Sequence, residues 1–336
     1  MTEVPETPEQ RSHSAPECGA AQFPAPAVPN GSAPSKYVFI VGLSRSGTSL
    51  MRKILNRSPQ VAICKENHFL GHLLASEGVR YKFRKFEPLA DDQNVRKLVD
   101  FLYDGGLERS SHFRGMSAQW RWIQRAIKRK EFLRRVLESS RTERDLFDIM
   151  MRLYAERMGR TILGEKTPAH VRYVPTLLEW FPQAKILHLI RDPRGIFVSE
   201  LRRRQTRAVT TPYRQLHHFP FLLKVYILVQ TTLFWLESAR LSRKYQRLYP
   251  DNYFVLRFED LVQSPETHIR RLCEFSGIEY QLSMLSQRVV SRGFRKGASG
   301  FDADAANRWK EQIDPWVSSW FARLFDRHLK SFSYSQ

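Results

Sequence analysis

The chain has 336 residues, of which 42% are hydrophobic and 12% aromatic, and its formal net charge at pH 7 is +20. This hydrophobic content excludes a wholly disordered chain, and the length allows a large core in one or two domains. The positive charge predicts an anionic partner: a polyanionic ligand, an acidic substrate or an anionic membrane surface. Nucleic acid is not expected, because no helix-turn-helix, zinc-finger or RNA-binding pattern is found.

Residues 1–35 contain seven prolines and six alanines and are predicted to form a disordered tail. The first residues are polar and acidic, unlike a secretory signal, and the three cysteines are isolated in sequence. Both features favour a cytoplasmic location in a reducing compartment. Residues 36–336 are expected to form the folded domain.

Residues 37–41 form a short aromatic and β-branched run, which predicts a strand buried on both faces. A loop bounded by Gly42 and Gly47 follows, and then a helical pattern begins. A strand, a glycine-bounded loop and a helix in this order present backbone N–H groups to an anion, usually a phosphate. We expect the anion to be held by Arg45, Ser46, Gly47, Thr48 and Ser49.

The composition of this loop narrows the ligand. Nucleoside triphosphatases carry a lysine directly after the second glycine, whereas this chain has Thr48 there and carries its cation inside the loop, as Arg45. The loop therefore predicts binding of a 5′-phosphate without a metal-chelated triphosphate, and we expect no metal site.

The later segments alternate between strands and helices. Strands are predicted at 61–63, 161–164, 185–190 and 253–258, and helices at 174–180, from about 196, at 221–246 and from 265 to 275. Residues 70–158 show helical spacing and a basic face, which indicates a helical insertion serving as a lid or an acceptor-binding region.

This alternation predicts an α/β fold with a central parallel sheet between helical layers. Ligands of such sheets bind at the carboxyl ends of the strands. We therefore expect the 42–48 loop, Glu66, Lys166 and Arg191 to converge on one crevice. Residues 219–236 are the most hydrophobic stretch, and basic residues follow directly at 240–247. A buried core helix is the preferred interpretation, and a peripheral membrane contact of residues 219–247 is the alternative.

Four segments together resemble the sulfotransferases that use 3′-phosphoadenosine 5′-phosphosulfate (PAPS), over about residues 36–312. Residues 39–50 resemble the family's 5′-phosphosulfate loop, with Ser44 in place of the usual proline. Residues 190–199 resemble the 3′-phosphate motif, in which Arg191 and Ser199 have the family's eight-residue spacing. Residues 257–261 (Arg-Phe-Glu-Asp-Leu) resemble its R-Y-E-D-L strand end, and Arg295, Lys296 and Gly297 resemble its late R-K-G segment.

The resemblance is nearest to the bacterial and Golgi-type group that includes the tyrosylprotein sulfotransferases, and it implies a P-loop-like three-layer fold. It implies an O-sulfotransferase (EC 2.8.2 class) that moves the sulfuryl group of PAPS to a hydroxyl of a glycan, peptide tyrosine, lipid or small molecule. Glu66, which lies 21 residues after Arg45, would be the general base, with His68 and His170 as rival bases. Arg45 and Lys166 would stabilise the transferred group and the leaving oxygen. The implied nucleotide-binding residues are Arg45, Ser46, Gly47, Thr48, Ser49, Arg191, Ser199, Arg295, Lys296 and Gly297.

Two other functions stay open at this point. One is a P-loop kinase or nucleotide hydrolase, which the missing lysine disfavours. The other is a non-catalytic protein of the same fold that binds polyanions or membranes. The acceptor, which would be acidic if the basic insertion binds it, and the oligomeric state are not determined by the sequence.

Overall fold

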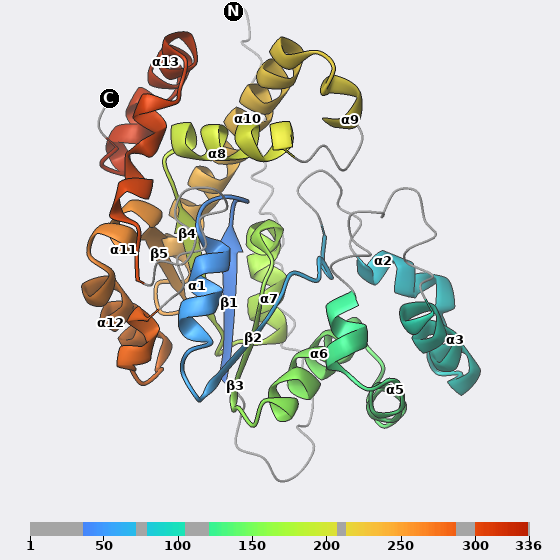
Figure 1. The fold of residues 1–336 in the computed structure, drawn as a ribbon. Helices are drawn as coiled ribbons and strands as arrows, with labels where there is room; N and C mark the ends of the chain where they lie inside the picture. The colour runs from blue at the N-terminus through green and yellow to red at the C-terminus, as the bar shows by residue number, and fades with distance from the viewer. Residues whose placement is uncertain (1–35, 72–78, 105–120, 207–212, 287–299, 335–336) are drawn as a thin grey trace, which may run out of the picture. The chain divides into compact units, whose positions relative to one another are not determined.

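A computed structural model describes residues 36–71, 79–104, 121–206, 213–286 and 300–334. Within these residues the chain forms a five-stranded sheet in which every strand pair is parallel, in the order β2-β3-β1-β4-β5 (Figure 1). The strands are β1 (Lys36–Gly42), β2 (Val61–Cys64), β3 (Ile162–Lys166), β4 (Lys185–Ile190) and β5 (Tyr253–Arg257). The predicted parallel α/β sheet is confirmed.

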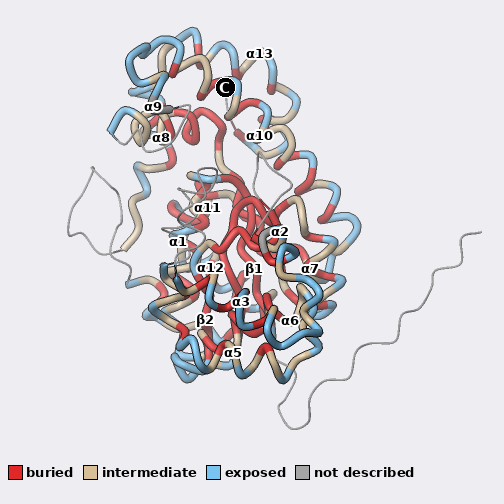
Figure 2. The backbone as a smooth tube through the Cα atoms, turned by 90° about the vertical axis from the view of Figure 1, so that its right-hand side faces the viewer, coloured by how far each residue is buried: buried red, intermediate tan, exposed pale blue. Residues whose placement is uncertain are grey.

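The central strand β1 is buried on both faces, which explains its continuous apolar sequence. Tyr37, Phe39 and Val41 belong to one hydrophobic cluster, and Val38 and Ile40 belong to another. This alternation follows the two-residue period of a strand. In Figure 2 the strands form the buried centre between more exposed helices.

Helices cover both faces of the sheet. On one face α1 (Thr48–Leu55) and α12 (Pro265–Ser276) contribute to the second cluster, and η4 (Leu282–Leu285) adds to it. On the other face α6 (Glu143–Arg157) and α7 (Val174–Trp180) contribute to the first. The arrangement has three layers, helix, sheet and helix, as the sequence predicts.

The chain between β2 and β3 begins with an irregular segment, residues 65–71, and most of the rest that is described is helical. After α2 (Val79–Phe83) and η1 (Arg84–Phe86) come α3 (Asp92–Tyr103) and α5 (Arg129–Leu137), and α6 leads back to the sheet. Their apolar residues extend the first hydrophobic cluster. The predicted helical character of the insertion is found here; its use as a lid or acceptor site stays a prediction.

A third cluster lies among α8 (Pro193–Thr206), α10 (Pro220–Leu248) and α13 (Pro315–Ser331), with Trp235, Phe321 and Phe325 at its centre. Helix α8 begins earlier than the predicted start near residue 196, because the Asp192 carboxylate accepts the Arg194 N–H at 2.8 Å. Shorter elements complete the chain: η3 (Pro168–Tyr173), α9 (Tyr213–Leu216), α11 (Phe258–Gln263), η5 (Ala303–Ala306) and η6 (Arg308–Glu311).

Among the helices that the structure describes, α10 alone is long and apolar enough to cross a membrane, judged by length and composition. Eleven of its residues are buried, and Trp235 packs against Phe325 with a ring-centroid distance of 5.2 Å. One side of α10 therefore belongs to the core, as the preferred interpretation expects.

His188 on β4 gives a testable pH dependence. It is fully buried between Tyr253 and Ser238, and burial lowers its pKa from 6.5 to about 3. Between these values the unfolded chain binds a proton that the native chain does not, so acidification destabilises the fold. We expect the free energy of unfolding to fall by about 2 kcal/mol between pH 7 and pH 5 because of this group. Chemical denaturation should show the stability gap between wild type and His188→Gln narrowing by that amount, and a constant gap would contradict the assignment.

Candidate active site

The loop between β1 and α1 has a conformation that exposes donors. Gly42 and Gly47 have φ of 139° and 96°, and Gly47 is the N-cap of α1 without a side-chain cap. The first turn of α1 contains no acidic residue, so its N–H groups and positive helix end are available to an anion. Arg45 has φ of 74°, a strained conformation that is common at functional positions.

Close packing explains the two glycines. A Cβ atom at Gly42 would lie 2.4 Å from the Leu189 carbonyl oxygen of β4, and one at Gly47 would lie 2.6 Å from the Phe258 ring. The loop is therefore held tightly between the end of β4 and α11, where only glycine fits.

The hydroxyl groups of the loop have different positions. Ser46 is buried and donates through Oγ to the Leu43 carbonyl at 2.7 Å, so its side chain closes the loop and does not line the cleft. The side chains of Arg45, Thr48 and Ser49 do line the cleft. Of the predicted loop hydroxyls, Thr48 and Ser49 are the ones placed to contact a ligand.

Arg191 lies where β4 ends, directly beside the loop. Its Nη1 donates to the Arg45 carbonyl at 3.0 Å and its Nη2 to the Ala305 carbonyl at 2.9 Å, while its guanidinium lies 4.1 Å from the Phe258 ring centroid. Burial lowers the pKa of Arg191, and its buried Nε has no hydrogen-bond partner. A buried cation with an unused donor is suited to an anionic ligand.

Ser199, on the second turn of α8, connects this helix to the 42–48 loop. Its Oγ accepts a hydrogen bond from Arg45 Nε at 2.9 Å, and both side chains line the cleft. The parallel pairing of β1 with β4 brings the loop and the start of α8 to the same sheet edge, although the residues are 154 positions apart.

Glu66 and Lys166 form an ion pair at the carboxyl ends of β2 and β3. Lys166 is 4% exposed, whereas the Glu66 side chain is 28% exposed and lines the cleft. Burial acts to raise the pKa of Glu66, but the hydrogen bond with His68 and the charge of Lys166 outweigh it and lower this pKa to about 2. Glu66 is therefore ionised at neutral pH in the free protein.

The two rival histidines lie behind this pair. His68 is buried with its Nε2 3.5 Å from Glu66 Oε2, and it has φ of 51°. His170 is fully buried; its Nε2 accepts the Leu70 N–H at 3.3 Å and its Nδ1 contacts Glu165. Neither histidine lines the cleft, so Glu66 is better placed to meet a substrate.

Two contacts that hold Glu66 and the next residue, Asn67, were not expected from sequence. Trp122 of the helical insertion donates through its indole N–H to the Glu66 carbonyl at 3.1 Å. Thr167 accepts the Asn67 N–H at 3.2 Å and donates to Glu165 at 2.5 Å, which ties the end of β3 to the segment that carries Glu66. These partners are about 56 and 100 residues away in sequence, and no local pattern indicates them.

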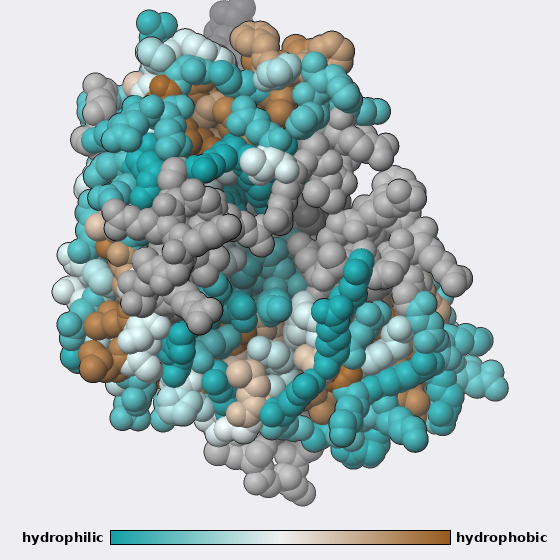
Figure 3. Space-filling model, in the orientation of Figure 1, coloured by the Kyte–Doolittle hydropathy of each residue, from teal (hydrophilic) through white to brown (hydrophobic). Residues whose placement is uncertain are grey.

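One cleft of about 1480 Å³ is lined by Arg45, Thr48, Ser49, Glu66, Lys166, Arg191 and Ser199. Twelve basic and two acidic residues line its described walls, and Figure 3 shows hydrophilic residues around the hollow at the centre of this face. Such a surplus of cations attracts a polyanionic ligand. The predicted convergence at the strand ends is confirmed for the 42–48 loop, Glu66, Lys166 and Arg191.

The late segment Arg295, Lys296 and Gly297 lies outside the described residues. Within the described ranges, no group of three or more His, Cys, Asp or Glu side chains is arranged to hold a metal ion. The donors found in the cleft are cations, hydroxyls and backbone N–H groups, a set suited to phosphate or sulfate oxygens.

The parallel sheet, the glycine-bounded loop and the basic cleft at its edge define a P-loop-like α/β protein with a cleft suited to an anionic ligand. The sequence profile of the sulfotransferase family matches residues 37–281, well over half of the chain. The chain belongs to the sulfotransferase family.

Two curated relatives are similar to parts of the chain. The omega-hydroxy-beta-dihydromenaquinone-9 sulfotransferase Stf3 of Mycobacterium bovis is 31% identical over 147 residues, which cover 40% of this chain and 33% of that protein. Protein-tyrosine sulfotransferase A of Caenorhabditis elegans is 25% identical over 252 residues, covering 75% of this chain and 52% of that protein. The chain thus spans about a third to a half of the length of these relatives.

Among solved structures, the sulfotransferase domain of the Synechococcus PCC 7002 olefin synthase aligns with a TM-score of 0.52 and 18% identity, over 92% of this chain and 98% of that one. At this identity the likeness concerns the fold alone, and it agrees with the P-loop-like sheet described above.

Proposed function

We propose that the protein is an O-sulfotransferase that moves the sulfuryl group of PAPS to an acceptor hydroxyl. The observation that carries the proposal is the common cleft in which the 42–48 loop, Arg191 with Ser199, and the Glu66–Lys166 pair meet. Membership of the sulfotransferase family supports the same reaction.

Two elements of the cleft suit the two ends of the nucleotide. The N–H groups of the loop and the side chains of Arg45, Thr48 and Ser49 would bind the 5′-phosphosulfate. Arg191 and Ser199 would bind the 3′-phosphate, and the unpartnered Nε of Arg191 supports this assignment. The resemblance adds Ser46 and Gly47 of the loop, and Arg295, Lys296 and Gly297, to the nucleotide-binding residues.

PAPS supplies an activated sulfuryl group joined to a phosphate that can leave. Glu66 would accept the proton of the acceptor hydroxyl as that oxygen forms its bond to sulfur. Lys166 and Arg45 would offset the negative charge on the transferred group and on the leaving phosphate oxygen. Because Lys166 is paired with Glu66 in the free protein, substrate binding must redirect the ammonium group from the carboxylate toward the nucleotide, and this raises the basicity of Glu66.

The acceptor carries the hydroxyl and, we propose, an acidic or phosphate group. Basic side chains from the insertion and from α8, including Arg125, Arg157, Arg202 and Arg203, also line the cleft. The names of the relatives describe one enzyme acting on a hydroxylated menaquinone and one acting on protein tyrosine. Lipid hydroxyls and tyrosine hydroxyls are therefore the first acceptors to test.

Transfer of labelled sulfate tests the proposal. The purified full chain is incubated with sulfur-labelled PAPS and a panel that contains a hydroxylated polyprenyl quinol, a tyrosine peptide with acidic neighbours and an acidic glycan. We expect label on at least one acceptor without added divalent metal. Matched reactions with γ-labelled ATP should transfer nothing; phosphate transfer from ATP in place of sulfate transfer would favour the kinase alternative.

Thr167 is proposed as a positioning residue for Glu66, and its removal should act on turnover. Thr167→Val removes the acceptor of the Asn67 N–H and the donor to Glu165, two buried hydrogen bonds. We expect kcat to fall by roughly tenfold to a hundredfold with little change in the nucleotide KM. Thr167→Ser keeps the hydroxyl and should restore kcat; equal losses in both variants would contradict the role.

A further inference from the structure

The exposed hydrophobic side chains are concentrated on two neighbouring helices. Of the twelve large hydrophobic residues that are exposed in the described part of the chain, nine lie on α13, on α10 or directly before it. Six of them define what we call the α10–α13 patch: Phe221, Leu222, Val229, Leu233, Trp316 and Trp320. Such a concentration marks an interaction surface, because isolated exposed hydrophobic residues are ordinary.

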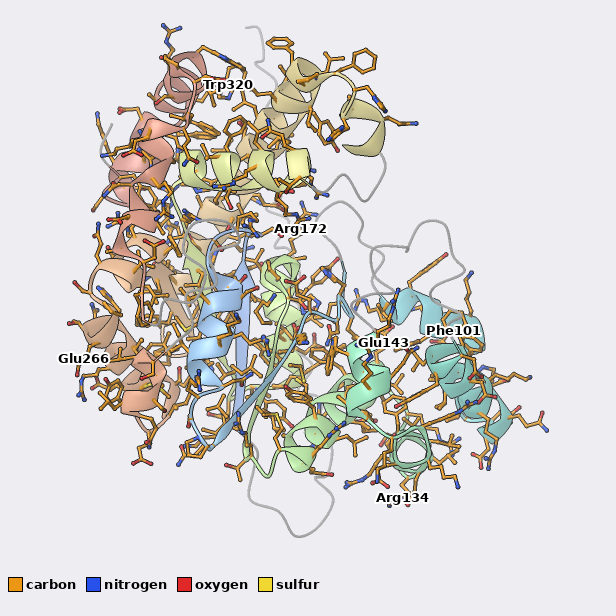
Figure 4. The ribbon with its side chains drawn as sticks, viewed as in Figure 1. Phe101, Arg134, Glu143, Arg172, Glu266 and Trp320 are labelled. Atoms are coloured by element: carbon orange, nitrogen blue, oxygen red, sulfur yellow. The ribbon has the colours of Figure 1, made fainter. Side chains whose placement is uncertain are left out.

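The patch is continuous across the two helices. The rings of Phe221 and Trp316 lie 6.4 Å apart, and the Trp320 indole N–H donates to Thr232 Oγ1 at 3.2 Å. Figure 4 labels Trp320 on the side of α13 that faces α10, and in Figure 3 hydrophobic residues appear at the top of the view, above the hollow. Leu222, Val229 and Leu233 are spaced seven and four residues apart, so they share one face of α10.

The charges around the patch are positive and uncompensated. Nearby acids are already paired: Asp314 contacts Lys224, and Asp326 contacts Lys330. On α13, Arg323 and Arg327 are exposed and lie three and seven residues, about one and two turns, after Trp320. No ion pair joins them to a described acid. On α10, Arg240 and Arg247 continue the face that carries Leu222 and Leu233 toward the C-terminus.

This combination fits the surface of an anionic lipid bilayer. Exposed aromatic and aliphatic side chains enter the boundary between headgroups and acyl chains, while arginines beside them meet anionic headgroups. A twofold contact with a second copy of the chain is less suitable, because it would gather the exposed arginines of both patches in one interface. We propose that the α10–α13 patch docks the protein on an anionic membrane surface.

Docking on the bilayer is favoured over crossing it. The opposite side of α10 carries Ile227 and Trp235, which are fully buried against α8 and α13. To cross a bilayer α10 would have to leave this cluster, and the charged residues Lys224 and Glu237 of its apolar half would enter the hydrocarbon region.

Docking would also place the cleft close to the membrane. Helix α8 packs on α10 and α13, with Phe197 and Phe321 rings 6.2 Å apart, and its last turns carry Arg202, Arg203 and Thr206 into the wall of the cleft. A surface-bound protein would therefore present its cleft to an acceptor that resides in the membrane. This second step rests on the proposed function; the docking itself does not.

Vesicle sedimentation tests the docking. The full chain is mixed with vesicles of phosphatidylcholine alone and with vesicles of phosphatidylcholine and phosphatidylglycerol in equal parts. We expect partition to the anionic vesicles, weakened by about tenfold or more in the double variant Phe221→Glu with Leu222→Glu. The matched control is Leu282→Glu on η4, because Leu282 is the most exposed of the twelve at 71% and lies outside the patch. It should bind vesicles as the wild type does.

Calorimetric titration with 3′,5′-adenosine bisphosphate checks that the variants are folded, so the docking can be judged independently of sulfate transfer. Unchanged nucleotide binding in both variants would show that they fold, and vesicle binding would then support docking even if no sulfate transfer is found. Equal vesicle binding by wild type and the double variant would overturn the proposal. A wild-type dimer in sedimentation velocity that the double variant dissociates, without vesicle binding, would overturn it in favour of self-association.

Discussion

Replacing Arg191 by alanine is expected to abolish the preference of the protein for a 3′-phosphorylated nucleotide. The wild type should bind 3′,5′-adenosine bisphosphate much more tightly than ADP, because Arg191 offers a permanent charge and the unpartnered Nε at the proposed 3′-phosphate position. Hydrogen bonds to charged groups contribute about 1.5–3 kcal/mol each, so the loss should be roughly a hundredfold or more for the bisphosphate. The affinity for ADP should fall far less. Calorimetric titration of both nucleotides measures the change.

Two controls separate this effect from a loss of structure or of general charge. Arg191 also donates to the Arg45 and Ala305 carbonyls, so thermal unfolding should be compared with Arg191→Lys, which keeps the charge but not the fork of donors. Arg203→Ala removes a basic residue elsewhere in the cleft wall and should weaken both nucleotides equally, by a few-fold at most. Equal binding of ADP and bisphosphate by the wild type would contradict the nucleotide assignment.

The sheet and its anion-binding loop were predictable because their signals are local. The continuous apolar run of β1 indicates a strand that is buried on both faces. The two glycines of the 42–48 loop stand where the backbone has positive φ values. Strand ends also predicted which side chains would meet, because a parallel sheet brings all carboxyl ends to one edge. Each inference needed only a few consecutive residues.

What the sequence did not reveal depends on contacts between distant segments. The pairing of Glu66 with Lys166 follows from how β2 and β3 align, which no short pattern contains. The short helix α11 was likewise expected as a strand end, since the apolar run continues through Phe258 into its first turn. Tertiary packing also brings Trp122 to the Glu66 carbonyl, to which its indole N–H donates a hydrogen bond.

In the free protein the proposed base, Glu66, and the proposed catalytic cation, Lys166, form an ion pair with each other. In this state His68 and Lys166 keep the Glu66 carboxylate ionised, and the Lys166 ammonium group is paired with it. Arg45 donates a hydrogen bond to Ser199, the proposed partner of the 3′-phosphate. Nucleotide binding would exchange both contacts for contacts with phosphate and sulfate oxygens. The same event would thus fill the anion sites and release the carboxylate, so that proton abstraction becomes efficient only when the sulfuryl donor is present.

Replacing Glu66 by glutamine is expected to remove most of the turnover while leaving nucleotide binding intact. Glutamine keeps the size of the side chain but cannot accept a proton from the acceptor, and positioned general bases contribute about 10²–10⁴-fold to rates. Labelled-sulfate transfer should show kcat falling within that range, with the affinity for 3′,5′-adenosine bisphosphate changed only slightly. His68→Gln, which alters a buried neighbour of Glu66, should be far less damaging. The reverse order of damage would assign the base to His68.

The pH dependence provides a second, independent check on Glu66. Because kcat/KM reports on the free enzyme, its acidic limb should follow the pKa of about 2 that His68 and Lys166 impose against the effect of burial. The acidic limb of kcat should lie at higher pH, since Lys166 no longer pairs with Glu66 once the nucleotide is bound and burial then raises the carboxyl pKa. Lys166→Met should shift the limb of kcat/KM upward as well, toward that of kcat. Coincident limbs in the wild type would show that Lys166 stays on Glu66 during turnover, and the exchange of contacts proposed above would then be wrong.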